Sequence, residues 1–336
     1  MKSNFLSYFA ALSAFILFST AAYPANVNTC NPSDTLKLTD AAIKLGFTLQ
    51  PIITGLPTGQ ESYGIIGAYG ITPTSTGNIM VTTRVTNDSV VRVYTNSENA
   101  CGSKLVASSK AKGLNSVAGQ WSDLASLDGK IYMILAGSLV QLNDSGIVAK
   151  VIIPNFPQLS GDITAASSIN SLIFGNTNIL VTAPNGGSAY NGLIPAPAAY
   201  QIYGALNGGA AYFDSASSTF YESPYGVLYG FSLNALTAST KFSLVMAGGP
   251  YGGGGFLQAK VTGPTSLNGL FVLNELNTAG DIALLNVSTG EKTIIATTTS
   301  SQAPGHSAGL QDGSLVVGRG GNIWKLRCPG CSFFSN

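Results

Sequence analysis

The chain has 336 residues, of which only 9% are charged, and its formal net charge at pH 7 is +1. Partners such as nucleic acid or an acidic membrane surface require a basic footprint, so this balance argues against both. Glycine is abundant, at 40 residues, and falls between short apolar runs without a collagen period. This composition is typical of an all-β protein with many turns.

The first segment predicts secretion. Lys2 precedes an apolar stretch that begins at Phe5, and the small residues Thr20, Ala21 and Ala22 follow that stretch. This order is typical of a secretory signal peptide, so we expect residues 1–22 to be removed, with Ala25 as a second candidate cleavage site. The alternative is a single membrane anchor, because the apolar stretch is almost long enough to span a bilayer. After cleavage we expect a secreted chain with no membrane contact.

Three N-glycosylation sequons agree with an extracellular or secretory-pathway location. They begin at Asn87, Asn143 and Asn286, and each lies at a predicted turn or strand end, where a glycan can project into solvent.

The strands are expected from residue 46 onward, after an N-terminal arm at 23–45 in which Leu36–Leu45 predicts a short helix or a docked segment. Phe47–Ile53 predicts a strand without a hairpin partner nearby. Residues 119–154 then contain four short apolar runs separated by turns such as Asp128-Gly129. Such a pattern predicts a four-stranded antiparallel meander.

The same meander recurs along the chain with a period of about 40 to 55 residues, which is a blade length typical of β-propellers. In the third copy we expect strands at 162–169 and 178–183, and the last two strands within 185–203. The last copy holds three strands, at 306–311, 314–319 and 322–327, and the Phe47–Ile53 strand supplies its fourth. The sequence therefore predicts a six-bladed β-propeller over residues 46–328, followed by a tail at 329–336. The alternative fold is a β-sandwich.

Four cysteines, an even number, suit an oxidising compartment: Cys30, Cys101, Cys328 and Cys331. The spacing of the last two resembles a redox or half-zinc motif, but it has no second pair and no strand-to-helix context, which favours a structural disulfide. Because the first and last strands are expected to pair, we favour a disulfide from Cys30 to Cys328 or Cys331. Cys101 then takes the remaining partner or stays free.

In a propeller, the innermost strands begin at one end of the central channel, so polar residues at those positions converge on one funnel. By matching the repeats, we expect this set to be Tyr69, Asp123, Asp162, Asn207, Gln258, His306 and Ser307. Carboxylate, amide and imidazole groups in a ring can hold a polar ligand or a cation. The alternative is that each residue only binds the backbone of the next blade.

His306 is the single histidine, so a general base active near neutral pH is sought there first. The alternative is a structural or solvated side chain. No Gly-x-Ser-x-Gly elbow supports a Ser-His-Asp triad. The glycine-rich run Gly248–Gly255 is followed by a strand rather than by a helix, which argues against a phosphate loop. We expect a crossover that can act as a lid over one mouth of the channel.

Two pairs of segments resemble the blades of the SMP-30/gluconolactonase/LRE-like six-bladed propellers, within the TolB-like group. These are Asn207-Gly208-Gly209 with Phe220-Tyr221-Glu222, and Asp123-Leu124 with residues 128–132. The resemblance implies a lactonase with a divalent cation such as calcium, held by an early Glu, the Asn of an Asn-Gly dipeptide and a later Asp. Asn207 matches the Asn of this ligand set, and Glu61 matches the early Glu. The later Asp has no match, because Gln258 and Lys260 stand where that carboxylate is expected.

Some fungal members of this group assist cyclisation in secondary metabolism without a metal, in an apolar funnel. The resemblance implies that aromatic residues line such a funnel here, namely Tyr63, Tyr69, Trp121, Tyr212 and Tyr251. The alternative for each is packing between blades.

Three functions follow, and the sequence leaves open whether the chain is an enzyme. The first is a secreted, monomeric propeller that binds a small organic molecule, either with or without transforming it. If it transforms the molecule, the catalytic candidates are Asp123, Asp162 and His306. Its ligand-binding candidates are Tyr69, Asn207, Gln258 and Ser307. The second is a metal-dependent lactonase or esterase that uses Glu61 and Asn207. The third is a non-enzymatic extracellular binding or host-interaction protein.

Overall fold

The computed structural model describes residues 31–33, 35–61, 64–116, 123–154, 163–175, 178–182, 190–195, 212–222, 227–232, 243–247, 255–275 and 280–334. Over these ranges nearly all regular structure is β, and the helical elements are α1 (Asp40–Lys44) and the 3-10 turn η1 (Ser167–Ile169). No helix in this part of the chain is long and apolar enough to cross a membrane. The predicted signal segment lies outside the described residues.

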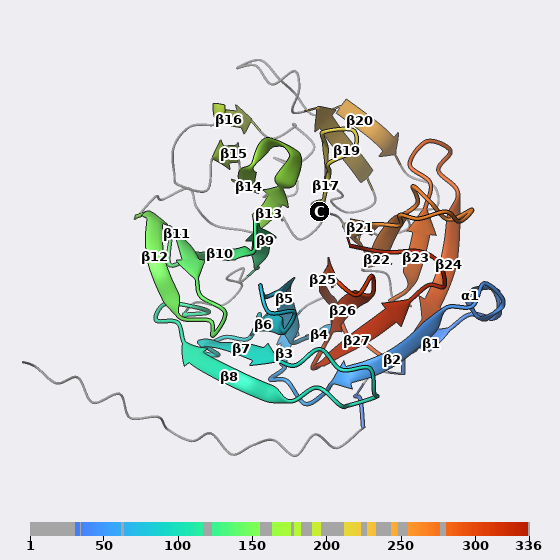
Figure 1. Ribbon diagram of the computed structural model, residues 1–336, viewed down its shortest axis with the longest axis horizontal. Coiled ribbons are helices and arrows are strands. Elements are labelled where there is room, and N and C mark those ends of the chain that lie inside the picture. Colours follow the sequence, from blue (N-terminus) through green and yellow to red (C-terminus); the bar gives the residue numbers. More distant parts are fainter. Residues whose placement is uncertain are drawn as a thin grey trace, which may run out of the picture.

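In the part of the chain that the structure describes, six sheets of four or five antiparallel strands stand around a common centre (Figure 1). In each sheet the consecutive strands run outward from the centre in chain order, and two sheets carry an additional N-terminal strand on the outer edge. This is the arrangement of a β-propeller, so the predicted all-β class is confirmed. We number the sheets in chain order. Sheet 1 contains β5 (Ala68–Pro73), β6 (Ile79–Thr83), β7 (Val90–Tyr94) and β8 (Leu105–Lys110). Sheet 2 contains β9 (Ala125–Leu127), β10 (Lys130–Leu135), β11 (Ser138–Leu142) and β12 (Val148–Ile153). Sheet 3 contains β13 (Ile163–Ala166), β14 (Ser171–Gly175), β15 (Asn178–Thr182) and β16 (Tyr190–Pro195).

The second half of the chain repeats this plan. Sheet 4 contains β17 (Tyr212–Asp214), β18 (Thr219–Glu222), β19 (Val227–Ser232) and β20 (Ser243–Ala247). Sheet 5 contains β21 (Gly255–Lys260), β22 (Phe271–Glu275), β23 (Ile282–Leu285) and β24 (Lys292–Thr297), with β1 (Lys37–Leu38) on its outer edge. Sheet 6 contains β25 (Pro304–Gly309), β26 (Leu315–Arg319), β27 (Asn322–Arg327) and β2 (Thr48–Ile53).

Sheet 6 joins the two halves of the chain. β2 runs antiparallel to β27, with Leu49 opposite Leu326 and Pro51 opposite Trp324. The early strand at Phe47–Ile53 therefore pairs with the last strand, as the sequence predicted for these two segments. The pairing therefore links an early strand to the last strand of the described chain, and separating these two segments requires breaking their strand ladder.

The N-terminal arm is docked on sheet 5 and also contains a short helix. β1 pairs with β24, and the hydroxyl of Thr39 donates to the carbonyl of Ile294 at 2.9 Å. The same hydroxyl accepts from the backbone N–H of Ala42 at 3.3 Å, which makes Thr39 the N-cap of α1. Both features that the sequence offered as alternatives are thus present. A two-stranded ribbon, β3 (Gly59–Glu61) with β4 (Gly64–Ile66), precedes sheet 1.

Sheet 3 differs from its prediction. We expected residues 178–183 to be the second strand of this copy, but β14 at Ser171–Gly175 is the second strand and β15 is the third. Within the described part of 185–203 there is one strand, β16, where two were expected. The error arises at the first hairpin, where the sequence has no glycine and Asn170 adopts the left-handed conformation instead (φ 45°). The apolar run at 162–169 was therefore taken as one strand, although it ends at Ala166 and turns.

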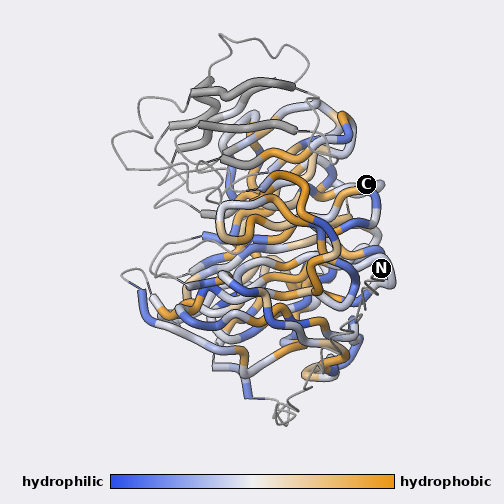
Figure 2. Tube along the Cα trace, turned by 90° about the vertical axis from the view of Figure 1, so that its left-hand side faces the viewer, coloured by the Kyte–Doolittle hydropathy of each residue, from blue (hydrophilic) through white to orange (hydrophobic). Residues whose placement is uncertain are grey.

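The core lies between neighbouring sheets. All residues of β6, β22 and β26 are buried, because both faces of these middle strands are covered by adjacent sheets. Figure 2 shows the apolar segments running through the interior and the hydrophilic segments at the turns. Outer strands are more exposed, as at Val106 of β8 (53%) and Val151 of β12 (50%).

The disulfide prediction was wrong. Cys328 is bonded to Cys331, with their Cα atoms 5.5 Å apart, so neither is available to Cys30. The reason is local, because Gly330 adopts a positive φ (69°) and turns the chain back within four residues. Cys101 is also disulfide-bonded, and its N–H donates to the carbonyl of Pro51 in β2 at 2.7 Å. Cys30 itself lies outside the described residues.

Candidate functional site

The innermost strands carry β-bulges where the sequence predicted polar site residues. In β5 the register shifts between Ala68 and Ile71, which places Tyr69 in the bulge. In β25 it shifts between Pro304 and Ser307, which places His306 there, and in β21 it shifts at Gln258. A bulge bends its strand and redirects the side chain away from the regular alternation. Local backbone irregularity therefore helps to set the direction of the Tyr69 and His306 side chains.

Asp123 and His306 form a buried pair across the centre. His306 Nδ1 lies 3.0 Å from Asp123 Oδ1, and the two side chains are 8% and 3% exposed. The carboxylate also accepts the N–H of Leu124 at 2.7 Å and the N–H of Ile163 at 3.2 Å. Asp123 therefore connects sheet 2 with sheets 3 and 6. The hydrogen bond from the N–H of Ile163 is a bond to the backbone of the next sheet, which is the alternative role that we considered for each of these polar residues.

Tyr69 and Arg84 complete the cluster. The rings of Tyr69 and His306 are 4.6 Å apart and tilted by 59°. The Cζ atom of Arg84 lies 5.6 Å from the centre of the Tyr69 ring, within the range of a cation–π contact. The imidazole is thus held by a carboxylate on one side and an aromatic ring on another.

Gly305 permits the close approach of β25 to β5. A Cβ atom at Gly305 would lie 2.0 Å from the carbonyl oxygen of Ala68 and 3.3 Å from the Cα of Tyr69. No side chain fits at that position without moving one of the two strands. The contact between His306 and Tyr69 depends on this glycine.

A polar network in sheets 5 and 6 fixes the backbone beside His306. Arg319 is fully buried and donates to Asn274 Oδ1 at 3.0 Å and to the carbonyl of Gln302 at 2.8 Å. Asn274 in turn donates to the carbonyl of Gly305 at 3.0 Å. Because these groups bond one another in a buried environment, they resist displacement of the β25 bulge.

A cavity of about 560 Å³ extends from the Asp123–His306 pair. It runs along the inner strands toward the turns that follow them, where Ser75, Ser167, Ser215 and Gln311 lie. We expected the funnel at the starts of the inner strands. Instead, the starts of the inner strands form the inner end of the cavity, and the turns that follow these strands form its rim.

The described wall of this cavity mixes two kinds of side chain. Apolar groups come from Ile71, Leu124, Leu127, Ile163, Phe213 and Phe334. Hydroxyl groups come from Thr72, Thr74, Ser75, Ser126, Thr164, Ser167, Ser215 and Ser307. Apart from the Asp123–His306 pair, the charged residue in the described wall is Asp128. Such a surface suits a largely uncharged molecule that can accept and donate hydrogen bonds.

The structure brings together several of the predicted residues. Tyr69, Asp123 and His306 are in one cluster, and Ser307 lines the cavity beside them. Tyr212 also lines the cavity, but its ring packs edge-on against Phe271 at 5.6 Å, which is the contact between sheets given as the alternative. Gln258 lies at the bulge of β21.

Among the described predictions, Glu61 is not part of this cluster. Glu61 ends β3, where it pairs with Gly64 in the short ribbon, and it does not line the cavity. Several predictions lie outside the described residues, namely Asp162, Asn207, Tyr63, Trp121, Tyr251 and the run from Gly248 to Gly254.

The described residues do not provide a complete metal site. Among them, no three His, Cys, Asp or Glu side chains gather in a way that could hold an ion. Both carboxylate oxygens of Asp123 face N–H groups, at Leu124 and Ile163, and this donor set suits a hydrogen-bonded carboxylate rather than a metal ligand.

Sequence reasoning missed Arg84, the hydroxyl groups at the rim and Phe334. The serine and threonine residues had a detectable pattern, because Thr74, Ser167 and Ser215 each follow directly after an innermost strand. Arg84 and Phe334 reach the cluster and the cavity through the path of the folded chain, and no local pattern marks them.

Comparison with known proteins supports the fold. No protein-family model and no curated protein matches this chain. Among solved structures, it is similar to a gluconolactonase from Xanthomonas campestris, with a TM-score of 0.60 and 12% identity over 92% of this chain and 99% of that one. It is also similar to a calcium structure of a Trichoderma reesei carbohydrate-active enzyme, with a TM-score of 0.56 and 12% identity over 89% and 98% of the two chains.

A third similar structure is a luciferin-regenerating enzyme, with a TM-score of 0.56 and 11% identity over 87% of this chain and 98% of that one. The chain therefore has a β-propeller fold similar to that of these solved structures, as its repeat pattern implied. At sequence identities this low, structural similarity establishes the fold alone, and the activity has to be argued from the site itself.

Proposed function

We propose that this chain is a secreted propeller whose six sheets are the blades of one ring, closed by β2, and whose central cavity binds a small organic molecule. The observation that carries this proposal is the Asp123–His306 pair at the inner end of a cavity of about 560 Å³. Small-molecule sites usually have volumes of about 300 to 1,000 Å³ and combine an apolar wall with a few polar groups.

The ligand expected from this wall is uncharged and carries a hydroxyl or carbonyl group. Apolar side chains such as Leu127 and Phe213 cover its hydrocarbon part, and hydroxyl groups such as those of Thr164 and Ser307 bind its polar atoms. His306 binds the polar group that reaches furthest into the cavity. A charged ligand would lose its hydration without a matching partner in the described wall.

The pair also has the geometry of an acid–base group. With Nδ1–H directed at Asp123, the other ring nitrogen of the neutral His306 imidazole, the buried Nε2, is its proton acceptor, and a ligand group has to reach this atom from the cavity. When Nε2 takes a proton from a ligand hydroxyl, the adjacent carboxylate stabilises the resulting imidazolium. Tyr69 packs on the ring and restricts its rotation. Binding followed by proton transfer is therefore the chemistry that these residues support best.

Secretion remains part of the proposal and has local support. The sequon residues Asn87 and Asn143 are exposed at turns. Asn143 Oδ1 accepts the N–H groups of Ser145 and Ile147, both at 3.0 Å, which holds the side chain at the surface. A glycan on the amide nitrogen would extend away from the sheet. The Cys328–Cys331 disulfide is of the kind that persists in an oxidising compartment.

The second candidate is a metal-dependent lactonase. It is favoured by the similarity to gluconolactonases and to a structure that contains calcium. In that case Glu61 and Asn207 would contribute ligands, and the cation would polarise the lactone carbonyl. The engagement of both Asp123 oxygens by N–H groups favours the first candidate over this one.

Ligand-observed NMR with a set of uncharged cyclic molecules tests the proposed function. We expect the secreted protein to bind members of the set that carry a ring and a carbonyl or hydroxyl group, and His306→Gln to weaken that binding about tenfold or more, as for a lost hydrogen bond in a buried site. Lys110→Ala, on the exposed outer strand β8, is the matched control. Binding that His306→Gln and Asp123→Asn leave unchanged would contradict a site in the central cavity. Binding restricted to glycans would favour a non-enzymatic extracellular binding protein.

A further inference from the structure

The C-terminal tail, residues 328–334, crosses sheets 5 and 6 and is bonded to both. Thr262 and Ser332 exchange two backbone hydrogen bonds of 2.8 Å, and the Thr262 hydroxyl donates to the Ser332 carbonyl at 3.1 Å. The N–H of Phe333 donates to the carbonyl of Gly313 at 3.0 Å. The tail, which follows the last strand, is therefore a hydrogen-bonded part of the fold.

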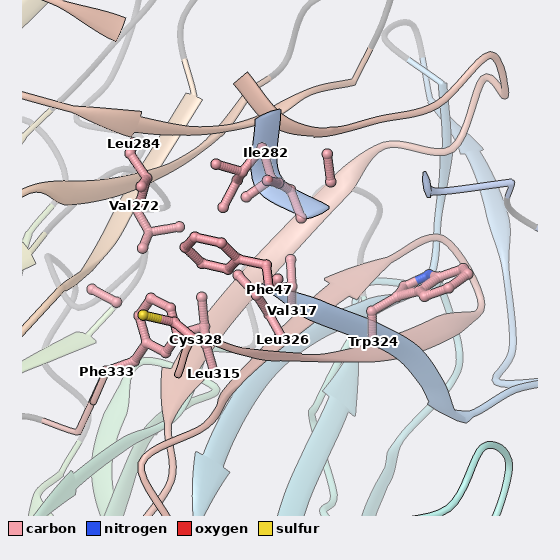
Figure 3. Close-up of a cluster of buried hydrophobic side chains, with 14 of the residues drawn as sticks. Phe47, Val272, Ile282, Leu284, Leu315, Val317, Trp324, Leu326, Cys328 and Phe333 are labelled. Carbon is pink, nitrogen blue, oxygen red and sulfur yellow. The ribbon is translucent and has the colours of Figure 1, made fainter. Parts of the chain in front are cut away.

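Phe333 anchors the tail in the core. Its side chain is 1% exposed and belongs to the same buried cluster as Leu315, Val317 and Phe47. Figure 3 shows Phe333 next to Cys328, at the edge of this cluster. Phe333 thereby connects the end of the chain to the segment that precedes β2.

Two further features fix the path of the tail. The Cys328–Cys331 disulfide holds the turn that starts it. A Cβ atom at Gly309, the last residue of β25, would lie 2.1 Å from the carbonyl oxygen of Phe333 and 2.9 Å from the Cα of Phe334. The tail can lie against β25 because residue 309 is glycine.

Phe334 follows directly and reaches a different environment. Its N–H donates to Ser332 Oγ at 3.1 Å, its side chain is partly exposed, and it lines the central cavity. Nearby parts of the described wall come from β25 and from the turn that follows it, at Ala308, Gly309 and Gln311. The tail thus adds an aromatic side chain to a cavity whose rim is otherwise rich in hydroxyl groups.

We propose that Phe334 is a specificity-determining residue of the ligand site, which selects molecules with a flat apolar ring. The inference rests on the proposed function, because it assigns a ligand class to the same cavity. The ring of the ligand packs against Phe334, while its carbonyl or hydroxyl group points inward to His306. Aromatic side chains favour such partners because a large flat surface is buried at little cost in conformational freedom.

Coumarin tests this inference, because it is uncharged, flat and carries one carbonyl group. We expect Phe334→Ala to weaken coumarin binding about fivefold to tenfold, as for the loss of one aromatic contact, and Phe334→Tyr to preserve it. Myo-inositol, a non-aromatic polyol, should bind the wild-type protein more weakly than coumarin does, and neither variant should change that weaker binding. The double variant Cys328→Ser/Cys331→Ser should weaken coumarin binding in the same direction, because it loosens the turn that positions the tail.

The controls separate this inference from the proposed function. Leu105→Ala removes an exposed apolar side chain (46%) from β8 and should leave coumarin binding unchanged. Equal thermal unfolding midpoints for Phe334→Ala and the wild-type protein show that the fold is retained. Coumarin binding that falls in His306→Gln but not in Phe334→Ala overturns the inference and supports the proposed function. Coumarin binding that falls in Phe334→Ala but not in His306→Gln supports the role of Phe334 and overturns the role of His306 in binding. A wild-type protein that binds myo-inositol but no coumarin overturns the proposed ligand class.

Discussion

Asp123 and His306 are far apart in the sequence, yet Oδ1 of the Asp123 carboxylate lies 3.0 Å from Nδ1 of the His306 imidazole. The first precedes β9 in sheet 2 and the second lies in the bulge of β25 in sheet 6, with sheet 1 between them in the ring. A contact of this kind forms only after the segments that carry sheets 2 and 6 have packed together. It therefore reports on both the fold and the site.

A double-mutant cycle on this pair should reveal strong coupling. We expect Asp123→Asn and His306→Gln each to destabilise the protein, and the double variant to cost less than their sum, with a coupling energy of about 1 to 3 kcal/mol. Urea unfolding of the four proteins measures this value. Additive effects would mean that the two side chains do not interact in solution.

Gly305→Ala should displace the bulge that carries His306. The added methyl group would meet the carbonyl of Ala68 at 2.0 Å, so we expect a loss of about 1 to 3 kcal/mol in the free energy of unfolding, as for other overpacked sites. Ligand binding should weaken as well, because Tyr69 and His306 move apart. At Gly59, in β3, the nearest atom to an added methyl is 3.8 Å away, so Gly59→Ala is the matched control and should change stability by about 0.5 kcal/mol or less. Equal effects of the two variants would argue against a tight contact at Gly305.

Acid should weaken the connection between sheets 1 and 6. Lys325 is 1% exposed, and its Nζ atom lies 2.8 Å from Asp312 Oδ2 and 2.7 Å from Glu98 Oε1. Burial alone would raise the pKa of Asp312, but hydrogen bonds from Lys325, Ser314 and Asn96 outweigh it and hold the pKa well below its usual value. Since the folded-state pKa is depressed, the stabilisation is complete above the unfolded-state pKa of about 3.9 and is lost as the pH falls below it.

Asp312→Asn tests that explanation. The variant should be less stable than the wild-type protein at pH 7 by about 1 to 3 kcal/mol, because Lys325 loses one of its carboxylate partners. The difference should shrink as the pH falls below about 3.9, because the Asp312 carboxylate of the unfolded wild-type chain then takes up a proton while that of the folded protein is still ionised. Urea unfolding at a series of pH values measures both quantities. A difference that is constant across the series would contradict the assignment to Asp312.

Most of the fold was predictable because each strand has a local pattern and each turn a local marker. The pairing of β2 with β27 could be inferred because Phe47–Ile53 had no partner nearby and the last copy lacked a strand. Sheet 3 could not be placed correctly, because Asn170 makes a left-handed turn that glycine usually makes. The disulfide of Cys328 was also mispredicted, since the tight turn at Gly330 brings Cys331 closer than any distant cysteine.

The site was predictable only in part. Asp123 and His306 were found because both are polar residues near the start of an innermost strand, and that position depends on the repeat alone. The direction of the cavity and the contribution of Phe334 depend on how the tail crosses sheets 5 and 6. That path is a tertiary property, set by contacts such as the hydrogen bond from the N–H of Phe333 to the carbonyl of Gly313 and by the burial of Phe333 in the core.

Calcium distinguishes the two candidate functions. In the first, Asp123 binds the N–H groups of Leu124 and Ile163 and no ion is needed, so EDTA should leave the Tm and coumarin binding unchanged. In the second, an ion that binds only the folded protein would stabilise it by about 2.7 kcal/mol at a calcium concentration of 100 times Kd. Calorimetry with calcium or EDTA measures this difference. A rise in Tm with calcium that Asn207→Ala and Glu61→Ala abolish would contradict the metal-free proposal and establish the lactonase candidate's ligand set. Because Glu61 lies in the β3–β4 ribbon and does not line the cavity, Glu61→Ala should leave the EDTA-treated protein's coumarin binding intact if the first candidate is correct.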